Sequence, residues 1–256
     1  MGESEKYLYC IIRCQQDRTF DVAGTDGEGR PVYALSHKGL AVVVSDTSLR
    51  RYESSRKNMM AHERVLEKVM EEFTVLPVRF GTVTDSATPA ESIRKLLSSR
   101  FEEFNKLLEE MEGKVELGLK AFWRDEKAVF DEIVAENSDI RRLRDSLSGK
   151  PPEAIRFEGI RLGQMVKEAL ERKRSQEAAR ILVPLRPIAR RVRENEVLMD
   201  RLILNAAFLV DRERELEFDQ AVRQLDEGLG HRIACKYVGP IPPYNFVNLV
   251  VNWQEL

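Results

Sequence analysis

Several features that would assign this chain to a functional class are missing or scarce. The 256 residues include only three cysteines and three histidines. An odd number of cysteines in a strongly charged chain indicates reduced thiols rather than a disulfide framework. Cys10 and Cys14 have a C-x3-C spacing, which is not a usual zinc or redox spacing, and Cys235 stands alone. We therefore expect the cysteines to pack as small apolar side chains.

Long apolar runs are also missing. No stretch approaches the roughly 18 to 20 apolar residues that a membrane-spanning helix needs. The run from Tyr7 to Ile12 is too short for a secretory signal, and Lys6 stands where a myristoylation signal needs Ser or Thr. The apolar segment YNFVNLVVNW near the C-terminus carries three asparagines. We expect no signal peptide, lipid anchor or membrane span.

The charge is balanced rather than dominated by one sign. Lys and Arg number 41 against 43 Asp and Glu, so the formal net charge is -2. This balance excludes the overall basic field that attracts nucleic acid. Hydrophobic residues make up 43% and charged residues 33%, which is typical of a soluble folded protein.

Catalytic and cofactor motifs are not found. His62-Glu63 in AHERVL would suit a zinc protease helix, but Leu66 stands where the second histidine is needed. The glycine-rich GTDGEGR lacks the Gly-Lys-Ser/Thr of a phosphate loop, and no G-x-S-x-G occurs. We expect no catalytic residue, metal site or cofactor, and we expect the three histidines to lie at the surface.

The first half of the chain predicts an α+β domain over residues 1–123. Strands are expected at 7–14 and at 114–123 (KVELGLKAFW), and a hairpin with its turn at HKG over 31–47. Apolar residues at three- and four-residue spacing predict a helix over 59–73 and a continuous helix from Thr88-Pro89 to a C-terminal stop at Gly113. The pattern favours an antiparallel sheet with both helices on one face, a ferredoxin-like layer.

The second half predicts a charged helical connector over 124–200, with one helix at 124–149 and another at about 158–182. Pro184 and Pro187 are expected to break or kink the segment after this second helix. The third part, 201–256, is expected to be a C-terminal α+β portion: strands at 201–211 and 231–239, a helix between them with Leu216 inward, and YNFVNLVVNW as a final core strand.

Two proline-containing apolar stretches remain unexplained by these elements. VLPVRFGT places Pro77 within a strand, which indicates an edge strand or a bulge, because proline cannot donate to a ladder. Arg79 there is either a snorkelling edge residue or a recognition residue. Together the two stretches supply eight candidate partner-binding residues: Pro77, Arg79, Phe80, Gly81, Pro242, Pro243, Tyr244 and Phe246.

The order of these motifs resembles the gas vesicle protein GvpF/GvpL family. YLYCII, HERVLEKVM, VLPVRFGTV, VELGLKAFW and GPIPPYNFVNL follow one another along essentially the whole chain, with Glu116 and Trp123 at the positions of the family pattern. The resemblance implies an N-terminal ferredoxin-like domain, a second α+β domain and no enzymatic activity. It also implies an accessory role in gas vesicle assembly in the cytoplasm, with the hydrophobic shell protein GvpA and other Gvp accessory proteins as partners.

Three functions remain open from the sequence. The first is an assembly factor that holds the shell subunit through a strand edge or a helix face. The second is a small-molecule-binding ferredoxin-like regulatory module, which would need a pocket. The third is an enzyme of a type that its motifs do not reveal.

Overall fold

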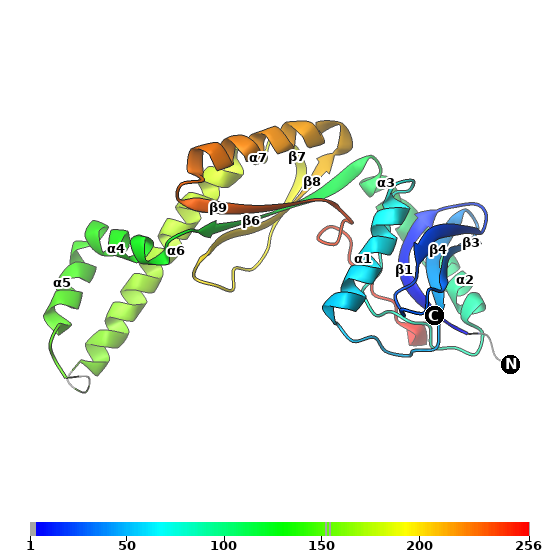
Figure 1. Cartoon of the computed structure of the whole chain (residues 1–256), viewed down its shortest axis with the longest axis horizontal. Helices are drawn as coiled ribbons and strands as arrows, with labels where there is room; N and C mark the ends of the chain where they lie inside the picture. Colours follow the sequence, from blue (N-terminus) through cyan, green and yellow to red (C-terminus); the bar gives the residue numbers. More distant parts are fainter. Residues whose placement is uncertain (1–3, 152, 154, 256) are drawn as a thin grey trace. The chain divides into compact units, whose positions relative to one another are not determined.

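The structure, a computed structural model, describes residues 4–151, 153 and 155–255. Contacts group the chain into two units, residues 1–116 with 240–256 (unit 1) and residues 117–239 (unit 2). The three-part division at 123 and 200 stays a prediction. The contact boundaries fall elsewhere, because the C-terminal tail from Pro240 packs with the N-terminal residues rather than with the strands that precede it. Figure 1 shows the elements in chain order.

Unit 1 contains a five-stranded sheet in the order β2-β3-β4-β1-β5. Its strands are β1 (Glu5–Arg13), β2 (Arg18–Ala23), β3 (Pro31–His37), β4 (Leu40–Thr47) and β5 (Leu76–Pro77). β1 lies between β4 and β5, and its side chains are buried continuously from Tyr7 to Ile12 because helices cover both faces of the sheet. The predicted hairpin is confirmed: Lys38 and Gly39, with φ of 54° and 88°, form the turn between β3 and β4.

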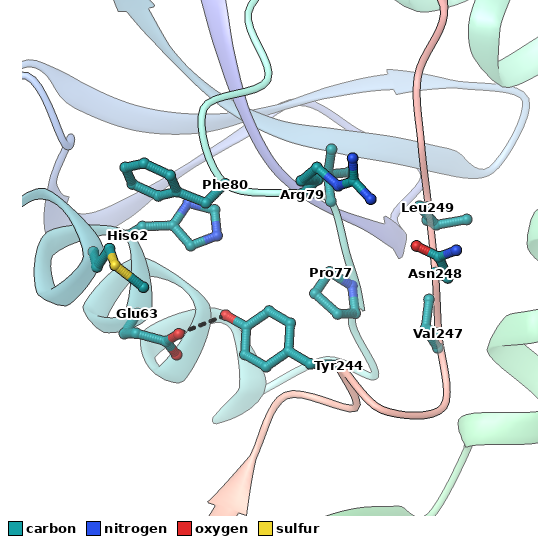
Figure 2. A pocket seen from close by; sticks show the side chains of 11 residues that line it. His62, Glu63, Pro77, Arg79, Phe80, Tyr244, Val247, Asn248 and Leu249 are labelled. Atoms are coloured by element: carbon teal, nitrogen blue, oxygen red, sulfur yellow. Dashed lines mark hydrogen bonds between the residues drawn. The ribbon is translucent and has the colours of Figure 1, made fainter. Parts of the chain in front are cut away.

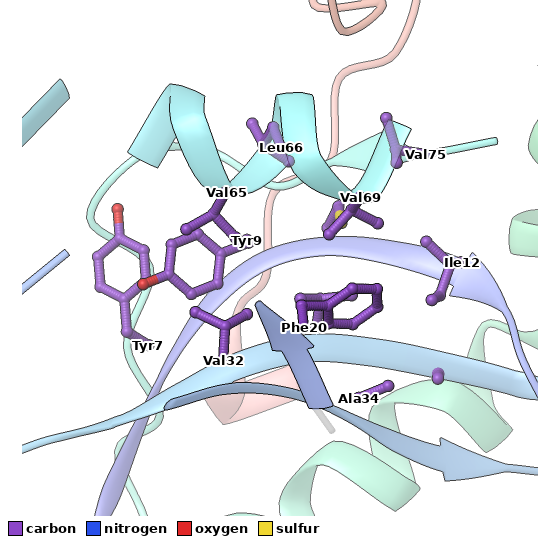
Figure 3. Close-up of a cluster of buried hydrophobic side chains, with 13 residues drawn as sticks. Tyr7, Tyr9, Ile12, Phe20, Val32, Ala34, Val65, Leu66, Val69 and Val75 are labelled. Atoms are coloured by element: carbon purple, nitrogen blue, oxygen red, sulfur yellow. The ribbon is translucent and has the colours of Figure 1, made fainter. Parts of the chain in front are cut away.

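The two faces of this sheet are covered by different helices. α1 (Arg56–Met70) packs Val65, Leu66 and Val69 into one core cluster with β1 to β4, as Figure 3 shows. A bulge after Leu8 puts the consecutive residues Tyr9 and Cys10 into that cluster. The green helix in Figure 3 lies on the opposite side of the strands from α1.

The helices on the second face are α2 (Pro89–Ser99) and α3 (Phe101–Met111), which contact β1 together with β3 and β4 or β5. Our expectation that both helices cover one face is therefore wrong. The expected continuous helix is also interrupted, because Arg100 leaves the helical region at φ -115° and ψ 26°. The start at Pro89 and the stop at Gly113, whose φ is 68°, are confirmed.

The C-terminal tail differs most from expectation. YNFVNLVVNW does not form a strand; among the described residues it makes a single parallel bridge, between Leu249 and Val78, and a 3-10 turn follows at Trp253–Glu255. Val247 and Leu249 are nevertheless buried. The segment is apolar because it covers unit 1, with two prolines and a turn before it rather than a regular strand.

Unit 2 is built on a four-stranded sheet in the order β7-β8-β6-β9. Its strands are β6 (Lys114–Trp123), β7 (Ala189–Glu194), β8 (Leu202–Asp211) and β9 (Ile233–Ile241). The strands expected at 114–123, 201–211 and 231–239 are confirmed, whereas β7 was not anticipated. KVELGLKAFW pairs in this second sheet rather than in the first, because its alternating pattern predicts a strand but not which sheet it joins.

Four helices complete unit 2: α4 (Glu126–Glu136), α5 (Ser138–Leu147), α6 (Arg156–Leu185) and α7 (Glu215–Leu229), the last preceded by a 3-10 turn at Arg212–Arg214. The single helix expected over 124–149 is divided at Asn137, whose ψ is 99°. α6 tolerates Pro184 in its last turn. In α7 the core residues are Phe218 and Val222, whereas Leu216 is 72% exposed, so its predicted inward position is wrong.

Candidate partner-binding pocket

A pocket of about 340 Å³ lies in unit 1, between α1, the segment that follows β5, and the C-terminal tail (Figure 2). It unites residues from three distant parts of the sequence. Its lining consists of Met59, His62, Glu63, Pro77, Val78, Arg79, Phe80, Tyr244, Val247, Asn248 and Leu249.

α1 supplies one wall because its apolar stripe faces the sheet and its flank faces the pocket. The Ser55 side chain caps the helix by accepting a hydrogen bond from the Asn58 amide at 3.3 Å. His62 and Val65 point inward, whereas Met59, one turn earlier than Glu63, remains 47% exposed at the pocket rim. The helix therefore offers the pocket both an apolar group and a carboxylate.

His62 is the polar centre of this wall and is only 2% exposed. Its Nδ1 lies 3.0 Å from the Tyr7 hydroxyl, and its ring stacks on Tyr9 with centroids 5.5 Å apart. Burial lowers the pKa of His62 to about 4, so the imidazole is neutral at physiological pH. Its Nε2 is buried without a hydrogen-bond partner among the described residues. The expected surface position of His62 is wrong.

A carboxylate–phenol pair lies beside His62. The Tyr244 hydroxyl donates to Glu63 Oε1 at 2.9 Å, and this pair joins the tail to α1 (Figure 2). Desolvation raises the pKa of the Glu63 carboxyl. Burial and the nearby Glu63 charge also raise the pKa of the Tyr244 phenol, which therefore stays protonated and remains a donor.

The segment after β5 supplies the opposite wall. Pro77 pairs with Cys10 at the sheet edge, which confirms the predicted edge position, and the Val78 amide continues the ladder to the Tyr9 carbonyl at 2.9 Å. Phe80 then packs edge-on against the His62 ring. The Arg79 side chain is exposed, and the part of the chain that the structure describes contains no charged partner for it.

The tail completes the pocket through several independent attachments to unit 1. The Glu116 carboxylate, fully buried, accepts hydrogen bonds from the Asn245 amide nitrogen at 2.8 Å and from its side-chain Nδ2 at 2.6 Å. Further along, Trp253 Nε1 donates to the Val83 carbonyl at 2.8 Å. Arg100 donates to the Val250 carbonyl at 3.0 Å. These contacts hold Val247, Asn248 and Leu249 against the pocket.

Half of the eight candidate residues meet in this pocket. Pro77, Arg79, Phe80 and Tyr244 line it, although they come from opposite ends of the sequence. Gly81 lies beside it, and its amide donates to the Tyr7 hydroxyl at 3.0 Å. Pro242 and Pro243 are buried and Phe246 is half-buried, all three outside the lining. A role in partner binding stays a prediction for all eight.

Sequence reasoning missed the lining residues of α1 and the end of the tail. The signal for His62 was present: it precedes Val65, Leu66 and Val69 at helical spacing, on the face that packs against the sheet. Met59, the first apolar residue of the helix predicted over 59–73, lies at the rim of the pocket instead of against the sheet. Asn248 and Leu249 could not be placed, because the tail was expected to belong to a different sheet.

The described residues show neither a metal-binding cluster nor a membrane-spanning helix. They contain no group of three or more histidine, cysteine, aspartate or glutamate side chains arranged to hold a metal ion. Within the same residues, no helix has both the length and the apolar character that crossing a membrane requires.

Comparison with known proteins gives the family. A family model described as gas vesicle synthesis protein GvpL/GvpF matches residues 5–248. Gas vesicle protein F of Dolichospermum flosaquae is 30% identical over 95% of this chain and 97% of its own length. The corresponding protein of Microcystis aeruginosa is 31% identical over 95% and 98%. Gas vesicle protein L1 of Halobacterium salinarum is 26% identical over 94% and 89%.

Solved structures agree with this match. The crystal structure of GvpF from Anabaena sp. PCC7120 superposes with a TM-score of 0.83 at 28% identity, covering 97% of this chain and all of that one. GvpF from Microcystis aeruginosa superposes with a TM-score of 0.80 at 28% identity, over 96% and 99% of the two chains. The α+β class and the resemblance found in the sequence are thereby confirmed, and the chain belongs to the GvpL/GvpF family of gas vesicle synthesis proteins.

Proposed function

We propose that this protein is a non-enzymatic accessory factor of gas vesicle assembly in the cytoplasm. It binds the hydrophobic shell protein GvpA and other Gvp accessory proteins during nucleation or growth of the vesicle, and it associates with the vesicle. The pocket of unit 1 is the observation that carries the proposal, because its lining is mainly apolar and includes Pro77, Val78, Phe80, Val247 and Leu249, as in sites that bind apolar groups.

The structure bears on how such a partner would bind. Addition of a partner strand at the β5 edge requires a free edge. Leu249 of the tail already bridges to Val78 there. A side chain that enters the pocket leaves this bridge in place, whereas a partner strand would have to displace the tail. We therefore favour insertion of partner side chains over strand addition at this position.

Coexpression tests the proposal directly. Tagged protein coexpressed with GvpA should recover GvpA in a pull-down, and recovery should fall several-fold with Arg79→Ala, whose side chain is exposed. Arg94→Ala, which removes an exposed arginine from α2, serves as the matched control and should leave recovery unchanged. If no Gvp protein is recovered under any condition, the assembly role is wrong. If GvpA is recovered but both variants behave alike, the pocket is not the site of the contact.

A small-molecule regulatory module is the second candidate, and the same pocket favours it. A volume of about 340 Å³ lies within the range of small-ligand sites. A ligand that binds only the folded state raises the melting temperature. Thermal shifts measured across a metabolite panel should therefore show saturable stabilisation that Phe80→Ala removes. The absence of any shift would leave the assembly role as the function of this pocket.

A further inference from the structure

One hydrogen-bond donor in the pocket, His62 Nε2, has no acceptor among the described residues. Gly81 donates its amide to the Tyr7 oxygen, so the Tyr7 hydroxyl proton is available for His62 Nδ1. A neutral imidazole that accepts at Nδ1 carries its proton on Nε2. This Nε2–H is buried and unpartnered in the part of the chain that the structure describes. A water molecule or a ligand oxygen in the pocket would have to supply its acceptor.

The position of His62 makes the pocket the place for that acceptor. Its ring lines the pocket, and Figure 2 shows one ring nitrogen turned toward the space between Phe80, Arg79 and Tyr244. A buried donor without an acceptor destabilises a protein, and such groups are rare in native structures. An oxygen atom of a bound ligand would satisfy it.

Arg79 is the second polar group that a ligand of this pocket has to match. It is the one cation among the residues that line the pocket, and its guanidinium is exposed. Glu63 is the one anion, and its carboxylate is occupied by the Tyr244 hydroxyl. Figure 2 places Arg79 away from the Glu63–Tyr244 pair. A negative group on a ligand would therefore avoid Glu63 and pair with Arg79.

The apolar lining is the third feature that a ligand of this pocket has to match. Phe80, Val247 and Leu249 surround the polar groups and need an aliphatic or aromatic group to cover them. A main-chain carbonyl, an apolar side chain and a neighbouring carboxylate satisfy His62, this lining and Arg79 at once. A polypeptide carries all three groups within two consecutive residues.

We propose that the pocket binds a partner segment in which an apolar residue is followed by an acidic one. The apolar side chain packs on Phe80, Val247 and Leu249, a main-chain carbonyl accepts from His62 Nε2, and the carboxylate pairs with Arg79. This inference rests on the proposed partner-binding function and names the chemistry of the partner.

Two matched peptides test this chemistry by NMR titration of the full-length protein. The first is acetyl-Ala-Leu-Asp-Ala-amide, and the second has Asn in place of Asp. The Asp peptide should bind about five-fold more tightly, as for a partly exposed ion pair, and added salt should reduce this preference. Equal affinity for the two peptides, or no binding at millimolar concentration, would overturn the proposal.

Two variants separate the polar contacts. Arg79→Gln should abolish the preference for Asp, whereas Arg94→Gln on α2 should preserve it. In His62→Asn the amide oxygen can still accept from Tyr7 while nothing replaces Nε2, so affinity for both peptides should fall about five-fold. If His62→Asn lowers only the melting temperature, the proposed contact is wrong. Since Arg79 is exposed, its variant remains informative even if His62→Asn unfolds.

Hexanoate tests whether a small amphipathic acid, rather than a polypeptide, supplies the carboxylate and the apolar group. Hexanoate that binds in an Arg79-dependent manner, with neither peptide bound, would identify a small amphipathic acid and contradict the proposal. The outcome for GvpA recovery is separate. Recovery that is unchanged in both pocket variants would retain the assembly role and reject this pocket as its site. Peptide binding without recovery of GvpA would retain the pocket as a peptide-binding site and reject the assembly role.

Discussion

At the scale of single residues, the environment of His62 departs most from what its residue type suggests. Its ring lies among Tyr7, Tyr9 and Phe80 at centroid distances of 5.7, 5.5 and 5.6 Å. These neighbours desolvate the imidazole without supplying a negative charge, so the charged form is disfavoured and the pKa falls to about 4. The neutral ring is therefore part of the core as well as of the pocket.

Acid should destabilise the protein through this residue. The folded-state pKa lies below the ordinary value of 6.5, so the stability that neutral His62 contributes is complete above 6.5 and is lost as the pH falls toward 4. The loss is on the order of 3 kcal/mol. Urea unfolding at stepped pH should show this slope in the native protein and not in His62→Asn. His231→Asn, an exposed histidine, should retain it; a slope that His62→Asn also retains would contradict the assignment.

Glu63 predicts a pH effect of the opposite sign. Its pKa is raised above the ordinary 4.5, mainly by desolvation, so stability declines as the pH rises from 4.5 through the raised value and the carboxyl ionises. Glu63→Gln removes this ionisation while its amide oxygen can still accept from Tyr244. The variant should equal or exceed the native melting temperature at neutral pH and lose the advantage at pH 4. Glu102→Gln, at an exposed position on α3, is the control.

At the scale of elements, the C-terminal tail is a covering segment that polar contacts attach in addition to its buried Val247 and Leu249. The Glu116–Asn245 pair lies at its start, and the Leu249–Val78 bridge and the Trp253–Val83 hydrogen bond follow. Glu116 and Asn245 belong to VELGLKAFW and PPYNF, two of the motifs on which the family resemblance rests. Their pairing gives a physical reason why those motifs occur together.

Glu116→Gln should release this tail. The carboxylate accepts two hydrogen bonds from Asn245, whereas a glutamine amide would turn an NH₂ toward one of the two donors. The unfolding free energy should fall by about 2 to 3 kcal/mol, the loss of a buried charge-assisted hydrogen bond. Hydrogen exchange at 244–253 should accelerate more than exchange in β4. Glu112→Gln, an exposed position near the start of β6, should change neither quantity.

Most regular elements could be predicted, because the spacing of apolar residues and the glycine and proline residues at element ends are local features of the sequence. The β3–β4 turn, the Pro89 start, the Gly113 stop and strands β6, β8 and β9 all follow from nearby residues. The breaks at Arg100 and Asn137 could not, since neither is a glycine or a proline. Arg100 is held by contacts with Glu103 and the distant Val250 carbonyl, and sequence pattern does not encode the second.

The pocket was predicted only in part for the same reason. Pro77, Arg79, Phe80 and Tyr244 stood out because proline and aromatic residues interrupt otherwise simple strands. That they share one pocket depends on the path of the tail back to unit 1, which is a long-range property of the fold. The residues contributed by α1 depend on which edge of that helix the tail approaches.

At the scale of the whole molecule, each unit has its own sheet and its own polar anchor with one buried carboxylate, Glu116 in unit 1 and Glu177 in unit 2. In unit 2 this anchor is an ion network: Arg232 donates to Glu132 at 2.8 Å and to Glu177 at 3.2 Å, and Lys173 lies 3.0 Å from Glu132. It joins α4 and α6 to the start of β9. Hydrogen bonds from Arg232 and then from Lys173, together with their charges, lower the pKa of Glu132 to about 2. The Glu177 side chain is only 7% exposed.

Removal of Arg232 should therefore weaken unit 2 selectively. Arg232→Ala leaves the Glu177 carboxylate buried with Arg180, at 3.5 Å, as its ion-pair partner among the described residues, and the expected loss is about 2 to 3 kcal/mol. Hydrogen exchange followed by mass spectrometry should show faster exchange in β8 and α6 and unchanged exchange in β1 and β4. Arg144→Ala, which breaks an exposed pair with Asp145, should shift either unit by less than about 0.5 kcal/mol. Equal acceleration in both sheets of Arg232→Ala would mean that the two units unfold as one, against the independence that their separate cores predict.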